Sequence, residues 1–231
     1  MHFLSRIRDL FTDFLFPRSQ KVLALEALSA GALVDILPPA EHSEDPPAPD
    51  AGGRAGKNVL ALFDYSHPLV KEIIWELKYG GNVRIADKLG EILYDHIQHE
   101  LQDLTYFEKW SKPILLMPIP ISGKRRFERG WNQSELLAEA IMKRDSQNLF
   151  RYLPRQLVKA RETESQTKTA SRTERLGNIT NSMKVLNAES VGGECVIVLD
   201  DVTTTGSTFA EARRVLRAAG AKKILCVAVA H

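Results

Sequence analysis

The chain has 231 residues, enough for one domain of ordinary size and a small additional segment. Apolar residues make up 44% of the sequence and charged residues 26%, a composition that excludes a wholly disordered chain. The formal net charge of +2 neither requires nor excludes a nucleic-acid partner. The two cysteines, Cys195 and Cys226, each lie in an apolar run, so we expect buried thiols and no disulfide framework.

Residues 1–37 contain two apolar stretches. The first has the spacing of an amphipathic helix and lacks the uninterrupted apolar core of a signal peptide. The second is interrupted by Glu26 and Asp35 and falls short of the roughly 18 uncharged residues that cross a bilayer. We therefore expect a short helical segment, followed at 38–57 by a flexible linker rich in proline, glycine and acidic residues. The protein is expected to be cytoplasmic, without membrane insertion.

Residues 58–231 show the alternation of strands and helices that is typical of an α/β domain. Apolar runs predict strands at 59–63, 114–117, 195–199 and 224–230. Apolar residues at helical spacing predict helices at 66–78, 83–101 and 208–219, and a further helix that begins near Asn132. Between these elements we expect a basic loop at 124–130 and a long, mobile polar loop at 161–182. The last strand, helix and strand form a βαβ unit, which predicts a parallel sheet.

The end of the third predicted strand carries the residues with the clearest chemistry. Asp200 and Asp201 follow an apolar run that brings the chain to the carboxyl edge of the sheet, where open α/β folds bind ligands. Two adjacent carboxylates can accept hydrogen bonds from vicinal hydroxyls and hold a hydrated Mg²⁺.

The next residues open the following helix, where N–H groups and the helix dipole favour an anion. They are small and mostly hydroxylic: Thr204, Thr205, Gly206, Ser207 and Thr208. A diol site beside a phosphate site suits ribose 5-phosphate. The alternative, a solvated loop followed by a helix cap, is disfavoured by the ordered combination of strand, acids and hydroxylic residues.

This loop resembles the signature of type I phosphoribosyltransferases that binds 5-phosphoribosyl-1-pyrophosphate (PRPP). The wider order of motifs is similar to the ComF family, amidophosphoribosyltransferase-like proteins linked to natural competence and DNA utilisation. The further motifs that carry the resemblance are 65–81, Pro118-Ile119-Pro120, 126–133 and the polar positions of 161–178. The resemblance covers about residues 59–231 and implies a type I phosphoribosyltransferase-like fold, with a central, mostly parallel sheet flanked by helices.

The resemblance also implies roles for individual residues. Asp200 and Asp201 would be catalytic and bind the ribose hydroxyls, directly or through Mg²⁺, and 204–208 would hold the 5-phosphate. The pyrophosphate would meet a basic cluster of Lys124, Arg125, Arg126 and Arg129. The mobile loop that closes over the substrate would include Arg161, Gln166 and Arg172. Cations of this kind stabilise the charge that develops on leaving pyrophosphate, although a solvated basic turn is the alternative.

The sequence departs from the family at two points. ComF-like proteins often begin with a zinc module of paired C-x-x-C motifs, but residues 18–37 contain no cysteine, so we expect no zinc. Thr204 stands where purine-salvage relatives carry an aspartate near the base, and no acceptor is identified.

Three functions remain open: phosphoribosyl transfer, PRPP or nucleotide sensing without turnover in a DNA-uptake assembly, and single-stranded DNA binding through 124–131. The expected partners are PRPP or another ribose phosphate and proteins of competence or DNA processing. Formation of a homodimer is left open by the sequence.

Overall fold

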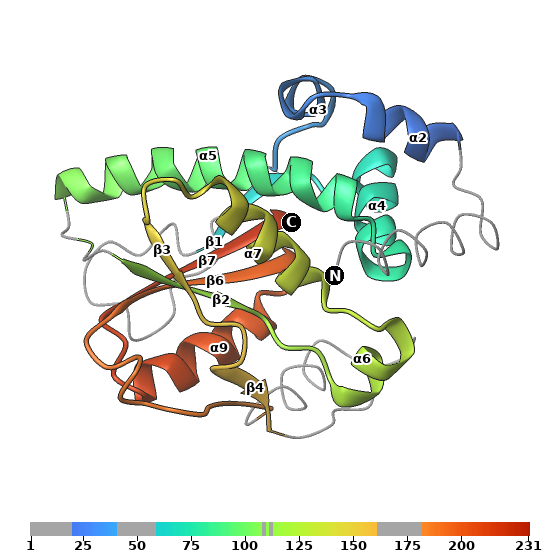
Figure 1. Cartoon of the computed structure of the whole chain (residues 1–231). Helices are drawn as coiled ribbons and strands as arrows, with labels where there is room; N and C mark the ends of the chain where they lie inside the picture. Colours follow the sequence, from blue (N-terminus) through green and yellow to red (C-terminus); the bar gives the residue numbers. More distant parts are fainter. Residues whose placement is uncertain (1–19, 41–58, 108–109, 111–112, 161–181) are drawn as a thin grey trace.

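The computed structural model describes residues 20–40, 59–107, 110, 113–160 and 182–231. Its centre is a five-stranded sheet in the order β1-β7-β6-β2-β3, in which every neighbouring pair is parallel (Figure 1). The strands are β1 (Val59–Phe63), β2 (Ile114–Pro118), β3 (Phe150–Tyr152), β6 (Cys195–Val202) and β7 (Lys223–Ala230). The predicted parallel α/β sheet is therefore confirmed, with β3 as an additional edge strand.

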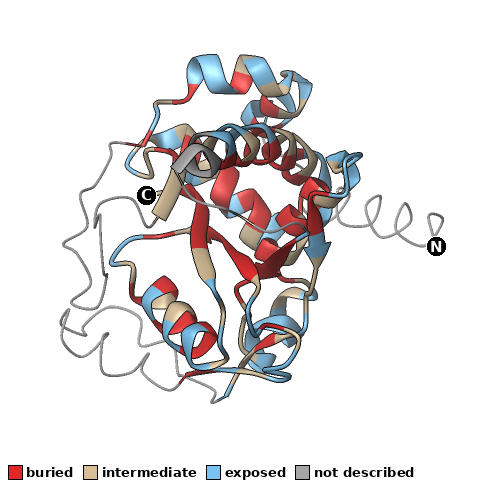
Figure 2. Cartoon of the chain, turned by 90° about the vertical axis from the view of Figure 1, so that its left-hand side faces the viewer, coloured by how far each residue is buried: buried red, intermediate tan, exposed pale blue. Residues whose placement is uncertain are grey.

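Helices cover both faces of the sheet (Figure 1). One face packs against α4 (Pro68–Trp75), α5 (Val83–Phe107) and α7 (Gln133–Arg144), and the other against α9 (Ser207–Ala218). Alternate residues of β6 join the two cores: Ile197 faces the first layer, and Val198 faces α9. Figure 2 shows the strands buried at the centre and the helices buried along their inner sides.

The N-terminal segment shares the core of the larger domain. Its helices α2 (Gln20–Ala27) and α3 (Ala30–Ile36) lie over α5 (Figure 1). The apolar residues that they contribute to the core are Val22, Leu25, Leu33 and Leu37. Pro39 forms an antiparallel bridge with Phe63, so the first residues of the expected linker contact β1. Residues 1–19 and the rest of that linker lie outside the described residues.

One predicted loop is a helix. Residues 124–130 were expected to form a basic loop, but α6 spans Gly123–Arg129. The Ser122 side chain accepts a hydrogen bond from the N–H of Arg125 at its start, and Gly130 ends it in a left-handed conformation (φ 81°). The prediction was wrong because the density of charge concealed a short helix whose two end signals are present in the sequence.

Two smaller elements complete the fold. A π-helical turn, η1 (Glu76–Gly80), follows α4 and is capped by Gly81. An antiparallel hairpin of β4 (Leu157–Lys159) and β5 (Met183–Val185) brings together the two ends of the segment 161–181. Cys195 and Cys226 are buried thiols, as predicted. Within the described parts of the chain, no helix has the length and apolar character needed to span a membrane.

Candidate functional site

Asp200 and Asp201 are the acidic residues at the end of β6, and they are part of the strand. We expected them on a loop after residue 199, but β6 stays paired with β7 through Asp200↔Ala228 and Val202↔Ala230. Their side chains are buried, with 8% and 3% of the residue surface exposed.

The amino end of α7 holds both carboxylates. Ser134 Oγ donates to Asp200 Oδ1 at 2.9 Å, and Gln133 Nε2 donates to Asp201 Oδ1 at 3.3 Å. The N–H of Asp201 donates to Asp200 Oδ1 at 2.9 Å. On its other oxygen, Oδ2, Asp201 has an ion pair with Lys78, whose Nζ lies 2.9 Å away, although the angles are not those of a hydrogen bond. The two acids are therefore fixed by neighbours on η1, α7 and β6.

The position of α7 follows from its first residues. The side chain of Asn132, the N-cap, accepts a hydrogen bond from the N–H of Ser134 and donates to the carbonyl oxygen of Ile119 at 2.9 Å. The N–H of Ile119 in turn donates to the carbonyl oxygen of Leu199 at 2.8 Å. The helix start is thus tied to the chain that leaves β2 and, through it, to the end of β6.

The surroundings of the acid pair favour retention of a proton. Burial, followed by the charge of the neighbouring Asp201 carboxylate, raises the pKa of Asp200 to about 8, against the hydrogen bond from the Asp201 N–H. Among the described residues, no third His, Cys, Asp or Glu joins them in a metal-binding group. Mg²⁺ is commonly held by one or two carboxylates together with water and substrate phosphates. The donor set fits that mode of binding.

The hydroxylic residues after β6 lie where an anion could meet a helix end. Gly206 is the N-cap of α9 in a left-handed conformation (φ 68°), and α9 begins at Ser207. Thr204 and Thr205 are exposed, and the hydroxyl of Thr205 lies 2.8 Å from that of the buried Ser207. The N–H groups of a first helical turn have no partner within their own helix. All five predicted cradle residues, 204–208, therefore surround the amino end of α9.

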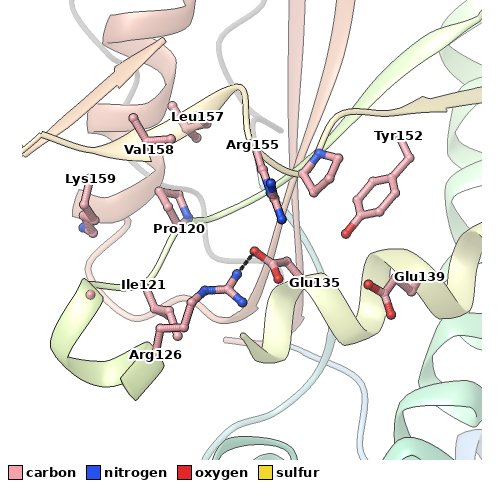
Figure 3. A pocket seen from close by; sticks show the side chains of 12 residues that line it. Pro120, Ile121, Arg126, Glu135, Glu139, Tyr152, Arg155, Leu157, Val158 and Lys159 are labelled. Carbon is pink, nitrogen blue, oxygen red and sulfur yellow. Dashed lines mark hydrogen bonds and ion pairs between the residues drawn. The ribbon is translucent and has the colours of Figure 1, made fainter. Parts of the chain in front are cut away.

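A cavity of about 520 Å³ opens beside this edge of the sheet, between α6, the first turns of α7 and the chain from β3 to β4 (Figure 3). Its charged and polar lining consists of Arg126, Arg155, Lys159, Glu135, Glu139 and Tyr152. Arg126 is ion-paired with Glu135 across the cavity floor. Burial lowers the pKa of Lys159, and the nearby charge of Asp200 opposes that shift. The cavity and the acid pair are neighbours, because Glu135 in the cavity wall directly follows Gln133 and Ser134, which bind the two acids.

The four cations predicted for the pyrophosphate side have different surroundings. Lys124, Arg125 and Arg126 are all exposed on α6, and of these three Arg126 lines the cavity. Arg129 points elsewhere: its guanidinium lies 5.0 Å from the centre of the Tyr79 ring, and Nη1 donates to Gln133 Oε1 at 3.3 Å. Lys124, Arg125 and Arg126 are consecutive in α6, so their side chains leave the helix in different directions.

Sequence reasoning gave no role to several residues that the structure places at the site. Arg155 and Lys159 lie on either side of the short apolar run 157–158 and both line the cavity. Basic residues around a short apolar run were the available signal in the sequence. Lys78 and Gln133 lay inside the family motifs but far from Asp201 in sequence. Arg161, Gln166 and Arg172 lie outside the described residues. The described residues on either side of that segment contact each other, since the N–H of Ala160 donates to the carbonyl oxygen of Ser182 at 2.8 Å.

A parallel sheet with helices on both faces, a buried acid pair at one strand end and a glycine-capped helix after it define an open α/β fold, which binds ligands at the carboxyl edge of its strands. Residues 88–231 match the family described as phosphoribosyl transferase domain, and the chain belongs to that family. The type I phosphoribosyltransferase-like fold expected from the sequence is thereby confirmed.

Two curated relatives extend this result. The chain is 28% identical over 173 residues to the DNA utilization protein YhgH of Escherichia coli (strain K12), which covers 73% of this chain and 69% of that protein. It is 35% identical over 156 residues to the competence protein ComFC of Bacillus subtilis (strain 168), covering 68% of this chain and 56% of that protein. These relatives confirm the resemblance to the ComF family.

Among solved structures, the chain is similar to the glutamine PRPP amidotransferase of B. subtilis in complex with ADP and GMP. The sequence identity is 18% and the TM-score 0.38, with 67% of this chain and 30% of that chain covered. The chain thus spans less than a third of the length of that enzyme.

Proposed function

We propose that this protein binds PRPP with Mg²⁺ and transfers the phosphoribosyl group to an acceptor, with release of pyrophosphate. The observation that supports it most is the acid pair at the end of β6 beside the amino end of α9. Carboxylates accept hydrogen bonds from ribose hydroxyls, and the helix end accepts the 5-phosphate, so the two parts match the two ends of one ligand.

The residues divide the reaction between them. Asp200 and Asp201 hold the ribose hydroxyls, directly or with Mg²⁺, while 204–208 hold the phosphate. The bond between C1 and the pyrophosphate oxygen breaks, its electron pair leaves with pyrophosphate, and a lone pair of the acceptor forms the new bond as the acceptor loses a proton. Bound Mg²⁺ supplies positive charge to the leaving group. On the protein side, Arg126 in the cavity stabilises that same charge.

A thermal-shift experiment tests the ligand. The full chain is heated with PRPP, ribose 5-phosphate or AMP, with and without Mg²⁺. At a hundredfold excess over the dissociation constant, binding adds about 2.7 kcal/mol of stability, so we expect a shift of several degrees for PRPP with Mg²⁺. The double variant Asp200→Asn, Asp201→Asn should lose the shift, and Asp35→Asn, on the exposed side of α3, should keep it. A wild type that does not respond to PRPP under any condition excludes the proposal.

A second measurement separates transfer from sensing. Release of pyrophosphate is followed with PRPP, Mg²⁺ and a panel of amines and nucleobases. Turnover with any acceptor supports the transferase. Tight PRPP binding without turnover across the panel favours the alternative, a non-catalytic PRPP sensor that works with competence or DNA-processing proteins, in line with the names of the relatives.

One observation favours single-stranded DNA as a second ligand. Trp75 and Tyr79 are 56% and 54% exposed, and their ring centres lie 5.4 Å apart, with the Arg129 guanidinium near Tyr79. Exposed aromatic rings beside cations bind bases by stacking. Trp131, expected in that role, instead donates its indole N–H to the carbonyl oxygen of Leu77.

Fluorescence anisotropy with labelled oligo-dT tests this candidate. Affinity should fall with salt and fall again about tenfold in Trp75→Ala, because stacking contributes about 1–3 kcal/mol per base. Leu186→Ala, an exposed apolar residue far along the chain, serves as the control. Binding that is independent of Trp75 removes this surface from consideration.

A further inference from the structure

The ammonium group of Lys78 forms an ion pair with one oxygen of the acid pair, Asp201 Oδ2. Its Nζ lies 2.9 Å from Asp201 Oδ2, and the two side chains are 24% and 4% exposed. The ammonium therefore reaches from the surface to a buried carboxylate. Any other cation that coordinates this oxygen must take the place of Lys78 or lie beside it, where like charges repel each other.

The backbone around Lys78 is held from two sides. Lys78 belongs to η1, and π-helical turns of this kind are frequent at functional sites. From the connection between α6 and α7, the indole N–H of Trp131 donates to the carbonyl oxygen of Leu77 at 2.9 Å. From the other side, Nδ2 of Asn82 donates to Glu76 Oε2 at 3.1 Å. These contacts fix the turn and aim Lys78 at Asp201.

The N-terminal segment strengthens the same turn. Nδ2 of Asn82 also donates to Glu26 Oε1 of α2 at 2.7 Å, and Arg84 Nη1 lies 3.0 Å from Glu26 Oε2. The side chain of Glu26 is 4% exposed and that of Arg84 is 72% exposed, so the carboxylate is packed while the guanidinium stays at the surface. The turn that carries Lys78 is therefore supported from three parts of the chain: Trp131, Asn82 and, through Asn82, Glu26 of α2.

We propose that Lys78 is a positioning residue that reserves Asp201 in the ligand-free protein, so that a divalent cation enters together with the phosphorylated ligand and not alone. A bare divalent cation adds two positive charges beside the ammonium. A cation that arrives with PRPP brings negative charge, and the long side chain of Lys78 turns from Asp201 to the phosphate oxygens. The PRPP half of this inference rests on the proposed function; the reservation of Asp201 does not.

Binding of Mn²⁺ alone tests the reservation. The full chain is titrated with Mn²⁺ by electron paramagnetic resonance, without any substrate. Coupled sites commonly change affinity by about 5- to 150-fold, so Lys78→Met should bind Mn²⁺ about tenfold more tightly than the wild type. Lys71→Met, an exposed lysine of α4, should match the wild type, and Lys78→Arg, which keeps the charge, should bind Mn²⁺ weakly. A thermal melt of each variant confirms folding, and Lys78→Gln replaces Lys78→Met if that variant does not fold.

The addition of PRPP tests whether the divalent cation binds together with the phosphorylated ligand. In the wild type PRPP should tighten Mn²⁺ binding strongly, and in Lys78→Met the gain should be smaller. If Lys78→Met gains no affinity for Mn²⁺ alone while PRPP and Mn²⁺ bind the wild type together, the inference is wrong and the proposed function stands. If Lys78→Met gains affinity but PRPP has no effect on any variant, Lys78 reserves Asp201 and the PRPP assignment is wrong.

Discussion

The carboxyl ends of β6 and β2 are neighbours in the sheet, with Leu199 opposite Pro118. The residues at these two strand ends differ in burial and in the sign of their charge. At the end of β6, two buried acids are held within the strand ladder. After β2, the chain turns into α6, a short helix that carries long cationic side chains and in which no residue is buried.

This difference indicates that the β6 end and α6 have different roles in the proposed reaction. Vicinal hydroxyls of a sugar have a fixed geometry, and rigid carboxylates on a paired strand match it without further loss of conformational entropy. A leaving group moves during the reaction, and flexible lysine and arginine side chains can follow its charge. In the proposed reaction, the β6 end would fix the position of the sugar, and the basic side chains of α6 would follow the leaving group.

Replacement of Gly206 should have the largest effect on the β6 side. Its left-handed conformation (φ 68°) disfavours any side chain, so a substitution would strain the backbone at the amino end of α9. We expect Gly206→Ala to weaken ribose 5-phosphate about a hundredfold, measured by calorimetry. Gly130→Ala is a matched control, since Gly130 is also left-handed (φ 81°) but has open space around it. Equal losses of affinity in both variants contradict the cradle.

Replacement of Arg126 should distinguish the contribution of α6 to ligand binding from that of the β6 end. Arg126 lines the cavity, so Arg126→Ala should weaken PRPP about tenfold, as expected for one lost charge-assisted contact. Ribose 5-phosphate, which lacks pyrophosphate, should bind as before. Lys124→Ala, on the exposed side of the same helix, should change neither. If both ligands weaken equally in Arg126→Ala, the cavity does not serve the pyrophosphate.

The acid pair should also limit stability at high pH. Because the folded pKa of Asp200 is raised to about 8, the folded protein keeps a proton that the unfolded chain releases from about pH 4 upwards. Its contribution to the free energy of unfolding therefore falls as pH rises across this interval. In Asp200→Asn, measured with EDTA, we expect a gain of at least about 1 kcal/mol at pH 8 that shrinks towards pH 5. A gain that does not depend on pH shows that the Asp200 charge is not its cause.

The smallest effect, on the free energy of unfolding, is expected for a substitution on α6. Phe127 on α6 is 91% exposed, so Phe127→Ala should alter the free energy of unfolding by less than about 0.5 kcal/mol in a urea titration. A larger loss means that α6 packs against another surface of the protein in solution.

Much of the fold could be predicted because its strands are long apolar runs. The strands β1, β2, β6 and β7 and the helix α9 were placed within a few residues of their observed ends. The three-residue strands β3, β4 and β5 were not predicted, since three residues carry too little periodicity to distinguish a strand from a loop. The end of β6 was placed too early because acids were taken as the start of a loop.

The site was predictable where its residues are consecutive. Asp200, Asp201 and 204–208 stand together in the sequence, and the structure brings them to one edge. The contact of Lys78 with Asp201 and that of Ser134 with Asp200 depend on how η1 and α7 dock on the sheet. No local pattern contains this information, and the same holds for Arg155 in the cavity wall.

The two cysteines offer a direct way to follow motions of the sheet. Cys195 and Cys226 are the cysteines of the whole sequence, and both are buried in the adjacent strands β6 and β7. A thiol reagent can modify them only when these strands separate, so the rate of modification in solution reports the opening of the sheet. Conversely, a cysteine placed at an exposed position such as Thr204 would be the one readily labelled thiol, ready to carry a fluorophore at the mouth of the site.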